Sequence, residues 1–106
     1  RLKKNIFPLK NAISVINKLK PVSYEKRNNL KSSEYLIKEN GFIAQELQKV
    51  LPNLVHETDN QEKILSVNYT SIIPILTKGI QEQQEEIIEL KKEISELKKL
   101  ILKSHK

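Results

Sequence analysis

Cysteine, methionine and tryptophan are absent from this chain of 106 residues, and glycine occurs only twice. Without cysteine the chain forms neither a disulfide nor a thiolate zinc site. Two glycines exclude a Gly-rich phosphate loop of the usual kind. No apolar run approaches the roughly 20 residues that span a membrane, and no signal-peptide pattern opens the sequence. We therefore expect no cofactor, no metal ion and no membrane partner.

Acidic side chains are scarce in the first third of the chain. Residues 1–31 contain nine Lys and Arg against Glu25 alone, whereas residues 81–106 contain six acidic side chains and six lysines. A basic segment can attract nucleic acid through its phosphates. Here the basic residues are scattered through an apolar helical pattern, without an aromatic platform or a nucleic-acid-binding motif. We therefore interpret them as a solvated face and expect no nucleic-acid partner.

Isoleucine recurs at every seventh residue between Asn68 and Ser104, and leucine follows three residues later in three of the repeats. A hydrophobic repeat of about 3.5 residues makes a helix that supercoils around copies of itself. The alternative is a long amphipathic helix that lies across the chain's own small domain. The expected seam between helices consists of Ile73, Leu76, Ile80, Gln83, Ile87, Leu90, Ile94, Leu97 and Ile101.

This seam leaves the number of helices open. Isoleucine at the a positions with leucine at the d positions favours two strands. Gln83 occupies a d position, where a buried amide costs stability but fixes the register and the number of strands.

The first half of the chain alternates between helical and strand patterns. Residues 8–19 place apolar side chains at helical spacing and end at Lys20-Pro21. Residues 22–26 alternate as a strand, and residues 35–37 favour an edge strand that ends at the Asn40-Gly41 turn signal.

The middle of the chain continues this alternation. Residues 43–51 favour a short helix that Pro52 ends, and residues 54–58 with 63–67 favour a hairpin. Thr70 or Ser71 is expected to cap the long helix, and Pro74 is tolerable because it lies in about the first turn. We therefore predict an α+β fold: a small domain over residues 1–68 with two short helices and three or four strands, then a coiled-coil helix over residues 69–106. A domain this small has a marginal core, so association would supply part of its stability.

Four motifs follow one another in a familiar order: Arg1-Leu-Lys-Lys-Asn-Ile6, Leu19-Lys-Pro-Val-Ser-Tyr24, Gly41-Phe-Ile-Ala-Gln-Glu46 running into Leu51-Pro-Asn-Leu-Val55, and Val67-Asn-Tyr69 before the heptads. Together they resemble the peptidase S74 family, the C-terminal intramolecular chaperone domains of phage tailspikes and fibres, found also in myelin-regulatory-factor-type proteins. The resemblance implies a homotrimer that helps the upstream segment of its own polypeptide to fold and then cuts itself off.

The resemblance also implies a catalytic pair. Family members cut before the serine of a Ser-Asp-x-Arg-Leu-Lys pattern, with that serine as nucleophile and the lysine as its base. The pattern makes Lys3 the base and puts the serine upstream of Arg1, so this chain is expected to be the inert cleaved product. A lysine acts as a base only when neutral, so a pKa of about 10.4 must fall through burial or like charge. Trimer packing would supply the burial, and assembly itself would then switch on the cut.

Gln45 and Glu46 have two interpretations. The resemblance places this motif near the cleavage region, where either side chain would orient the lysine or the scissile peptide. Alternatively, Gly41 makes a turn, Phe42 and Ile43 fill the core, and Glu46 is a solvated charge in the first turn of a helix. Asn68 stands where the family commonly has aspartate, which implies a helix-capping role.

The remaining polar residues favour structural roles. His56 lacks a second ligand at metal spacing, His105 belongs to the tail, and the acidic Glu57, Asp59 and Glu62 are expected on a solvated hairpin tip. The rival function is a non-catalytic coiled-coil oligomerisation module whose basic domain binds a partner or nucleic acid. Lys/Ile/Asn-rich usage indicates an AT-rich genome and leaves a viral or a cellular source open. We expect a virus-associated protein that acts in the host cytoplasm during assembly.

Overall fold

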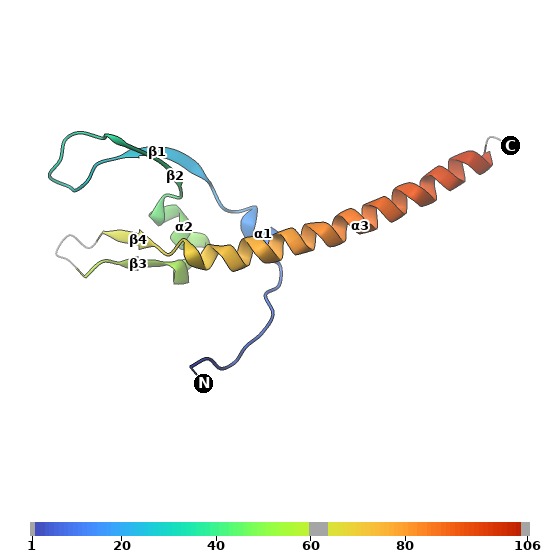
Figure 1. Cartoon of the computed structure of the whole chain (residues 1–106), viewed down its shortest axis with the longest axis horizontal. Helices are drawn as coiled ribbons and strands as arrows, with labels where there is room; N and C mark the ends of the chain where they lie inside the picture. The colour runs from blue at the N-terminus through green and yellow to red at the C-terminus, as the bar shows by residue number, and fades with distance from the viewer. Residues whose placement is uncertain (1, 60–63, 105–106) are drawn as a thin grey trace. The chain divides into compact units, whose positions relative to one another are not determined.

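The computed structural model describes residues 2–59 and 64–104 (Figure 1). The predicted α+β class is confirmed, with short helices, two small sheets and a long C-terminal helix. The chain forms two compact units, Arg1–Ile16 with Pro74–Lys106, and Asn17–Ile73. The division expected at residue 68 stays a prediction. The elements in chain order are α1 (Ala12–Ile16), β1 (Val22–Lys26), β2 (Ile37–Gly41), α2 (Ala44–Val50), η1 (Pro52–Leu54), β3 (Val55–Glu57), β4 (Leu65–Val67), η2 (Thr70–Ile72) and α3 (Ile73–Ser104).

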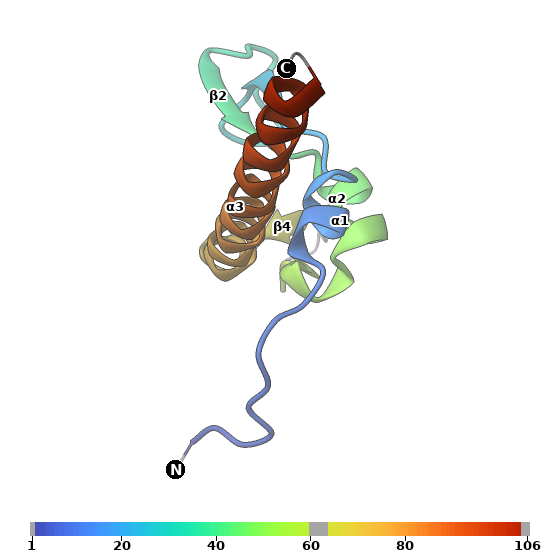
Figure 2. The ribbon, with the colours of Figure 1, turned by 90° about the vertical axis from the view of Figure 1, so that its right-hand side faces the viewer.

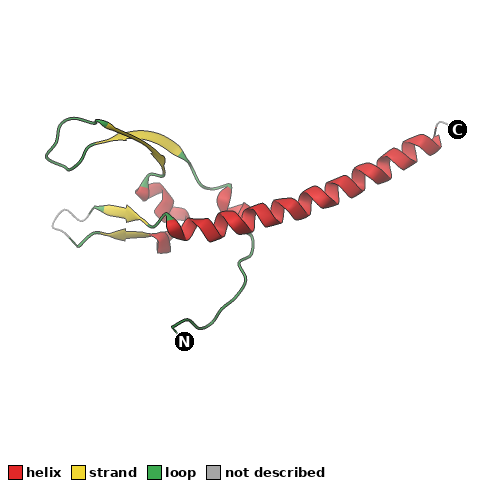
Figure 3. Ribbon diagram, viewed as in Figure 1, coloured by secondary structure: helices red, strands yellow, loops and turns green. Residues whose placement is uncertain are grey.

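The unit Asn17–Ile73, called the central unit below, contains two antiparallel strand pairs (Figure 3). In one pair Val22 of β1 lies opposite Gly41 of β2, and in the other Val55 of β3 lies opposite Val67 of β4. The strand expected over residues 22–26 is confirmed to the residue, and the expected hairpin is confirmed for its described part. Residues 60–63 of its turn lie outside the described residues.

The strand expected at residues 35–37 was placed too early. β2 begins at Ile37 and continues through Asn40 and Gly41, which pair with Ser23 and Val22. Asn-Gly favours a turn because both residues tolerate a positive φ, but neither of them has one here. Pairing with β1 therefore outweighs the local turn preference.

The core of the central unit forms where α2 meets the β3–β4 pair. Leu47, Val55 and Ile72 are buried. Partly buried apolar side chains pack against them: Leu19, Phe42, Ala44, Leu51, Leu54, Leu65 and Val67. Burying a side chain of this kind stabilises by about 1.5–3 kcal/mol, so a core with few such residues agrees with the marginal stability expected for the domain. The predicted end of α2 is confirmed, because η1 begins at Pro52.

The long helix α3 has 32 residues and begins at Ile73. Pro74 is its second residue, where a missing N–H costs no intrahelical bond. Thr70 and Ser71, the expected caps, lie inside the preceding η2 turn rather than directly before α3. Instead the Asn68 side-chain oxygen accepts a hydrogen bond from the Ser71 N–H at 3.3 Å. This bond lies at the η2 turn, so the role of Asn68 as a cap of the long helix stays a prediction.

The first helix is shorter than the pattern over residues 8–19 predicts. α1 covers only Ala12–Ile16, because Asn11 adopts a left-handed φ of 58° and interrupts the helical run. Residues 2–10 form no helix or strand and extend away from α3 in both views (Figures 1 and 2). Leu19 leaves the helix and packs on the core of the central unit.

Candidate functional site

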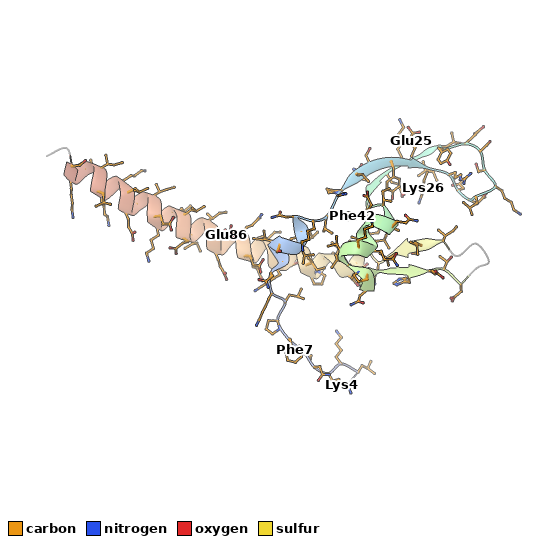
Figure 4. All side chains as sticks on the ribbon, turned by 180° about the vertical axis from the view of Figure 1, so that it is seen from behind. Lys4, Phe7, Glu25, Lys26, Phe42 and Glu86 are labelled. Carbon is orange, nitrogen blue, oxygen red and sulfur yellow. The ribbon has the colours of Figure 1, made fainter. Side chains whose placement is uncertain are left out.

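Lys3 lies in the extended segment of residues 2–10, every one of which is exposed. Asn5 has a positive φ of 55°, and the segment has no regular structure. Its apolar side chains face solvent as well: Ile6 is 65% exposed and Phe7 79% exposed. Lys4 and Phe7 stand out from the backbone in Figure 4. The segment that contains the expected base is thus uncovered in the single chain.

The start of α1 is fixed to α3 by a carboxylate. Glu82 Oε1 accepts a hydrogen bond from the Ile13 N–H at 2.9 Å, and Oε2 accepts one from the Ala12 N–H at 3.2 Å. The backbone hydrogen bond from Ile13, with further bonds from Ala12 and Asn11, lowers the pKa of Glu82 below its ordinary value. Sequence reasoning missed this contact, because the partners lie about 70 residues apart.

Gln45 and Glu46 lie in the first turn of α2 and face different hollows. Gln45 is exposed and lines a groove of about 370 Å³ together with Tyr24 and Tyr69. Glu46 lines a hollow of about 120 Å³ and forms an ion pair with Lys20, with 3.9 Å between Nζ and Oε1. Both side chains of this pair are substantially exposed, so it contributes at most about 1 kcal/mol.

The expected surroundings of this motif are partly wrong. Phe42 packs against the core as predicted, but Ile43 is 40% exposed, and Gly41 is part of β2 rather than of a turn. Glu46 occupies the first turn of α2, as the solvated-charge interpretation expects. Lys3 belongs to one unit and Gln45 and Glu46 to the other, so their joint catalytic role stays a prediction.

A cluster around Tyr69 was not foreseen. The Tyr69 hydroxyl accepts a hydrogen bond from the Phe42 N–H at 3.0 Å, and the two rings stack with centroids 6.1 Å apart. Gly41 lies directly beside this hydroxyl, where a Cβ would contact Tyr69 Oη and lie 3.1 Å from Tyr24 Oη. A hydrogen bond with Tyr69, followed by slight burial and the nearby Glu39, raises the pKa of Tyr24 to about 12. The only signal in the sequence was that Gly41 and Tyr69 both fall inside the quoted motifs.

The predicted seam of α3 is uncovered along its length. Its leucine and isoleucine side chains are between 43% and 67% exposed, and every residue from Gln83 to Ser104 is exposed. Within its own unit, α1 leaves this stripe exposed. Whether the stripe forms a trimer interface stays a prediction.

Other chemistry is limited in the described part of the chain. Residues 2–59 and 64–104 contain no group of three His, Asp or Glu that could hold a metal ion. Among these residues, no helix is both long enough and apolar enough to cross a membrane. His56 on β3 is exposed, as are Glu57 and Asp59, while Glu62 and His105 lie outside the described residues.

Comparison with known proteins gives one family and several relatives. The profile of Peptidase_S74, described as the chaperone of endosialidase, matches residues 1–56. The chain is 37% identical over 93 residues to the long tail fiber protein Gp37 of Enterobacteria phage M1, covering 86% of this chain and 37% of that protein. It is 34% identical to the Gp37 proteins of Salmonella phage S16 and Enterobacteria phage T2, covering 95% and 89% of this chain. The chain spans 14% and 7% of the length of those two relatives.

Proposed function

Since the chain belongs to the Peptidase_S74 family, the chaperone of endosialidase, we propose that it is a trimeric intramolecular chaperone for the assembly of a phage long tail fibre. Its client is the upstream part of its own polypeptide, and autoproteolysis releases it after the client has folded. It acts in the infected host during virus assembly. The family match and the tail-fibre relatives support this proposal.

One observation carries the proposal: the uncovered Ile/Leu seam on a helix of 32 residues. A single helix with an apolar stripe in water gains little from propensity, because most helical stability in proteins comes from packing. Each seam side chain that becomes buried stabilises by about 1.5–3 kcal/mol. Copies of the same helix provide the matching stripe, so association of α3 completes the fold.

The charges beside the seam favour one orientation of the copies. Glu86 and Glu93 occupy g positions, and Lys91 and Lys98 occupy the e positions five residues later. In a parallel, in-register coil each g glutamate faces an e lysine of the neighbouring helix. An antiparallel arrangement would place glutamate opposite glutamate and lysine opposite lysine. The pattern therefore favours parallel helices, whose N-terminal ends gather at the same end of the coil.

Three strands, rather than two, are assigned from the family resemblance. Ile at a and Leu at d mildly favour two strands, and Gln83 at a d position fixes the register and the number of strands without indicating which number. A parallel trimer holds three upstream chains in register and so lowers the entropic cost of starting an intertwined fold. Release of the chaperone then leaves the mature fibre behind its unfolding barrier.

The cleavage chemistry is assigned to Lys3 and the serine of the upstream pattern. Lys3 in its neutral form removes the serine hydroxyl proton, and the oxygen attacks the carbonyl carbon of the preceding peptide bond. The peptide nitrogen leaves as the serine amine and takes up the proton. Water then hydrolyses the resulting ester, so the net reaction is hydrolysis of one peptide bond.

The exposure of Lys3 explains why cleavage would follow assembly. In the single chain Lys3 and the neighbouring apolar side chains Leu2, Ile6 and Phe7 are all exposed. Packing against neighbouring chains would cover them together and favour an uncharged lysine. Gln45 and Glu46 are proposed to orient the lysine or the scissile peptide from α2.

The same exposure also favours the rival function, an oligomerisation module that cuts nothing. In that case the basic N-terminal part binds a protein partner or nucleic acid instead. A nucleic-acid complex would weaken steeply as salt is added.

Mass spectrometry of the whole polypeptide, including its upstream part, tests the proposal. The wild type should yield a fragment that begins at the serine of the pattern, Lys3→Ala should yield none, and the matched control Lys4→Ala should cleave normally. The seam variant Ile87→Asn with Ile94→Asn should be monomeric and uncleaved. Uncleaved trimers in the wild type would leave only the chaperone, and cleavage of the seam variant at the wild-type rate would refute activation by assembly.

A further inference from the structure

We propose that Glu82 is a positioning residue that anchors the Lys3-containing segment of each chain to that chain's own coiled-coil helix. The inference rests on the proposed function, because it assigns a role to the anchor in autoproteolysis. The anchor itself is defined by contacts between α1 and α3 within one unit.

The hydrogen bonds at the start of α1 show why a carboxylate is needed there. The first N–H groups of a helix have no intrahelical acceptor and are normally satisfied by a neighbouring side chain. Ala12 and Ile13 instead donate to the two oxygens of one distant carboxylate, Glu82. Hydrogen bonds to an ionised acceptor are about twice as strong as neutral ones. Glu82 therefore both caps α1 and fixes it to α3.

An apolar contact between Gly79 and Ile16 lies one turn before Glu82 on α3. At Gly79 an added Cβ would meet Ile16 Cδ1, so the last residue of α1 rests directly on the glycine backbone. Gly79 is buried, and Ala12 at the other end of α1 is only 4% exposed. Glu82 thus accepts hydrogen bonds from the first turn of α1, and Gly79 packs against Ile16 at the end of α1. Two contacts on successive turns of α3 fix both the position and the direction of α1.

These contacts leave the coiled-coil seam free. Gly79 is at a g position and Glu82 at a c position, whereas the apolar seam occupies a and d. The neighbouring seam residues Leu76 and Ile80 remain 43% and 67% exposed although α1 is in place. Glu82, at a c position, and the association of helices therefore do not compete for the same surface, whereas Gly79, at a g position, borders the seam.

The glutamates at the following c positions show that Glu82 differs from its equivalents. Glu89 and Glu96 occur seven and fourteen residues later, and both are exposed, whereas Glu82 is half-buried. The heptad pattern alone does not explain this difference. The contact with α1 does.

The consequence for the reaction is geometric. Lys3 precedes Ala12 by nine residues, so the anchored chain restricts the lysine to within about 30 Å of the start of α1, even when fully extended. In a parallel coil each chain places its own lysine segment at the same height. Loss of the anchor would release this segment and enlarge the volume that the lysine searches before it meets the serine.

The test compares Glu82→Ala with the matched control Glu89→Ala. On the processed chain, hydrogen exchange is followed at the Ala12 and Ile13 amides, and sedimentation reports the oligomer. On the whole polypeptide, mass spectrometry gives the cleavage rate. Glu82→Ala should remain oligomeric, exchange these amides about tenfold faster and cleave at least about tenfold more slowly, since one charge-assisted hydrogen bond corresponds to a factor of this size. Glu89→Ala should match the wild type, and Glu82→Gln, which keeps one acceptor oxygen, should be intermediate.

Each other outcome overturns the inference at a different point. Unchanged exchange in Glu82→Ala would show that the anchor is absent in solution. Faster exchange with wild-type cleavage would show an anchor without a positioning role, and the proposed function would stand. If the wild-type polypeptide never cleaves, autoproteolysis fails and the positioning role fails with it, whatever the exchange rates show.

Discussion

Replacing Gly41 by alanine should destabilise the chain through the Tyr69 hydroxyl. The added Cβ meets Tyr69 Oη directly and lies 3.1 Å from Tyr24 Oη. The Tyr69 ring has little freedom to withdraw, because it stacks on Phe42 and its hydroxyl accepts the Phe42 N–H. Either the ring moves and this hydrogen bond is lost, or β2 is displaced from β1 at the Gly41–Val22 pair.

The magnitude follows from three contributions. Forcing an extra methyl into a packed site costs about 1–3 kcal/mol. Loss of the Phe42 hydrogen bond costs about 1 kcal/mol. The smaller conformational freedom of alanine in the unfolded chain offsets about 0.4–1 kcal/mol. We therefore expect Gly41→Ala to lower the free energy of unfolding by about 2 kcal/mol, which shifts a urea midpoint by about 1 M.

The assay is urea unfolding of the chain at one fixed concentration, because the stability of an oligomer depends on concentration. Tyr69→Phe removes the hydroxyl and should cost about 1 kcal/mol alone. In the Tyr69→Phe background Gly41→Ala should be nearly neutral, giving a coupling of about 1–2 kcal/mol. Gly79→Ala is the contrasting control, since its Cβ meets only the flexible end of Ile16 and alanine favours a helix by about 1 kcal/mol. Additive effects at Gly41 and Tyr69, within about 0.5 kcal/mol, would refute the argument.

Three further predictions concern the seam and two titrating groups. Ile87→Asn with Ile94→Asn should abolish association in sedimentation, whereas Ile88→Asn, at a b position, should not. Because the folded pKa of Glu82 is lowered, the anchor is fully present at neutral pH and is lost as pH falls through that folded value, so amide shifts at the start of α1 should titrate below the ordinary glutamate range. The fold favours the neutral form of Tyr24, whose pKa is raised to about 12. The neutral Tyr24 therefore contributes to the free energy of unfolding at lower pH, and this contribution is lost as pH rises through about 12. Ultraviolet absorbance should show one tyrosine titrating late, and a single transition of all tyrosines near the ordinary value of about 10 would contradict it.

Patterns with a strict period were predicted well from the sequence. β1 has the bounds that alternation over residues 22–26 predicts, and α2 ends where Pro52 requires it to end. The long helix follows from the heptads alone. In each case the signal is local, because every side chain in the pattern contributes to one face of one element.

The failures occur where a distant partner decides the local backbone. The apolar spacing over residues 8–19 predicts more than two turns of helix, but only Ala12–Ile16 form one, after a left-handed Asn11. Asn40 and Gly41 favour a turn by propensity, but they continue β2 because β1 provides a pairing edge. In both cases tertiary contacts outweigh a local preference of about 1 kcal/mol.

Of the expected site residues, Lys3 was assigned by a motif, and the motif indicates a chemical role without a position in space. The structure shows that the chain nine residues after Lys3 is held by Glu82, a residue that the heptad pattern classes as one of several solvated glutamates on α3. A helix proposed to form the oligomer can thus also hold the segment proposed for cleavage, because Glu82 at its c position points away from the seam. If assembly and cleavage are coupled, this shared helix is the physical link: the seam brings the chains together, and the opposite flank sets where each lysine can reach.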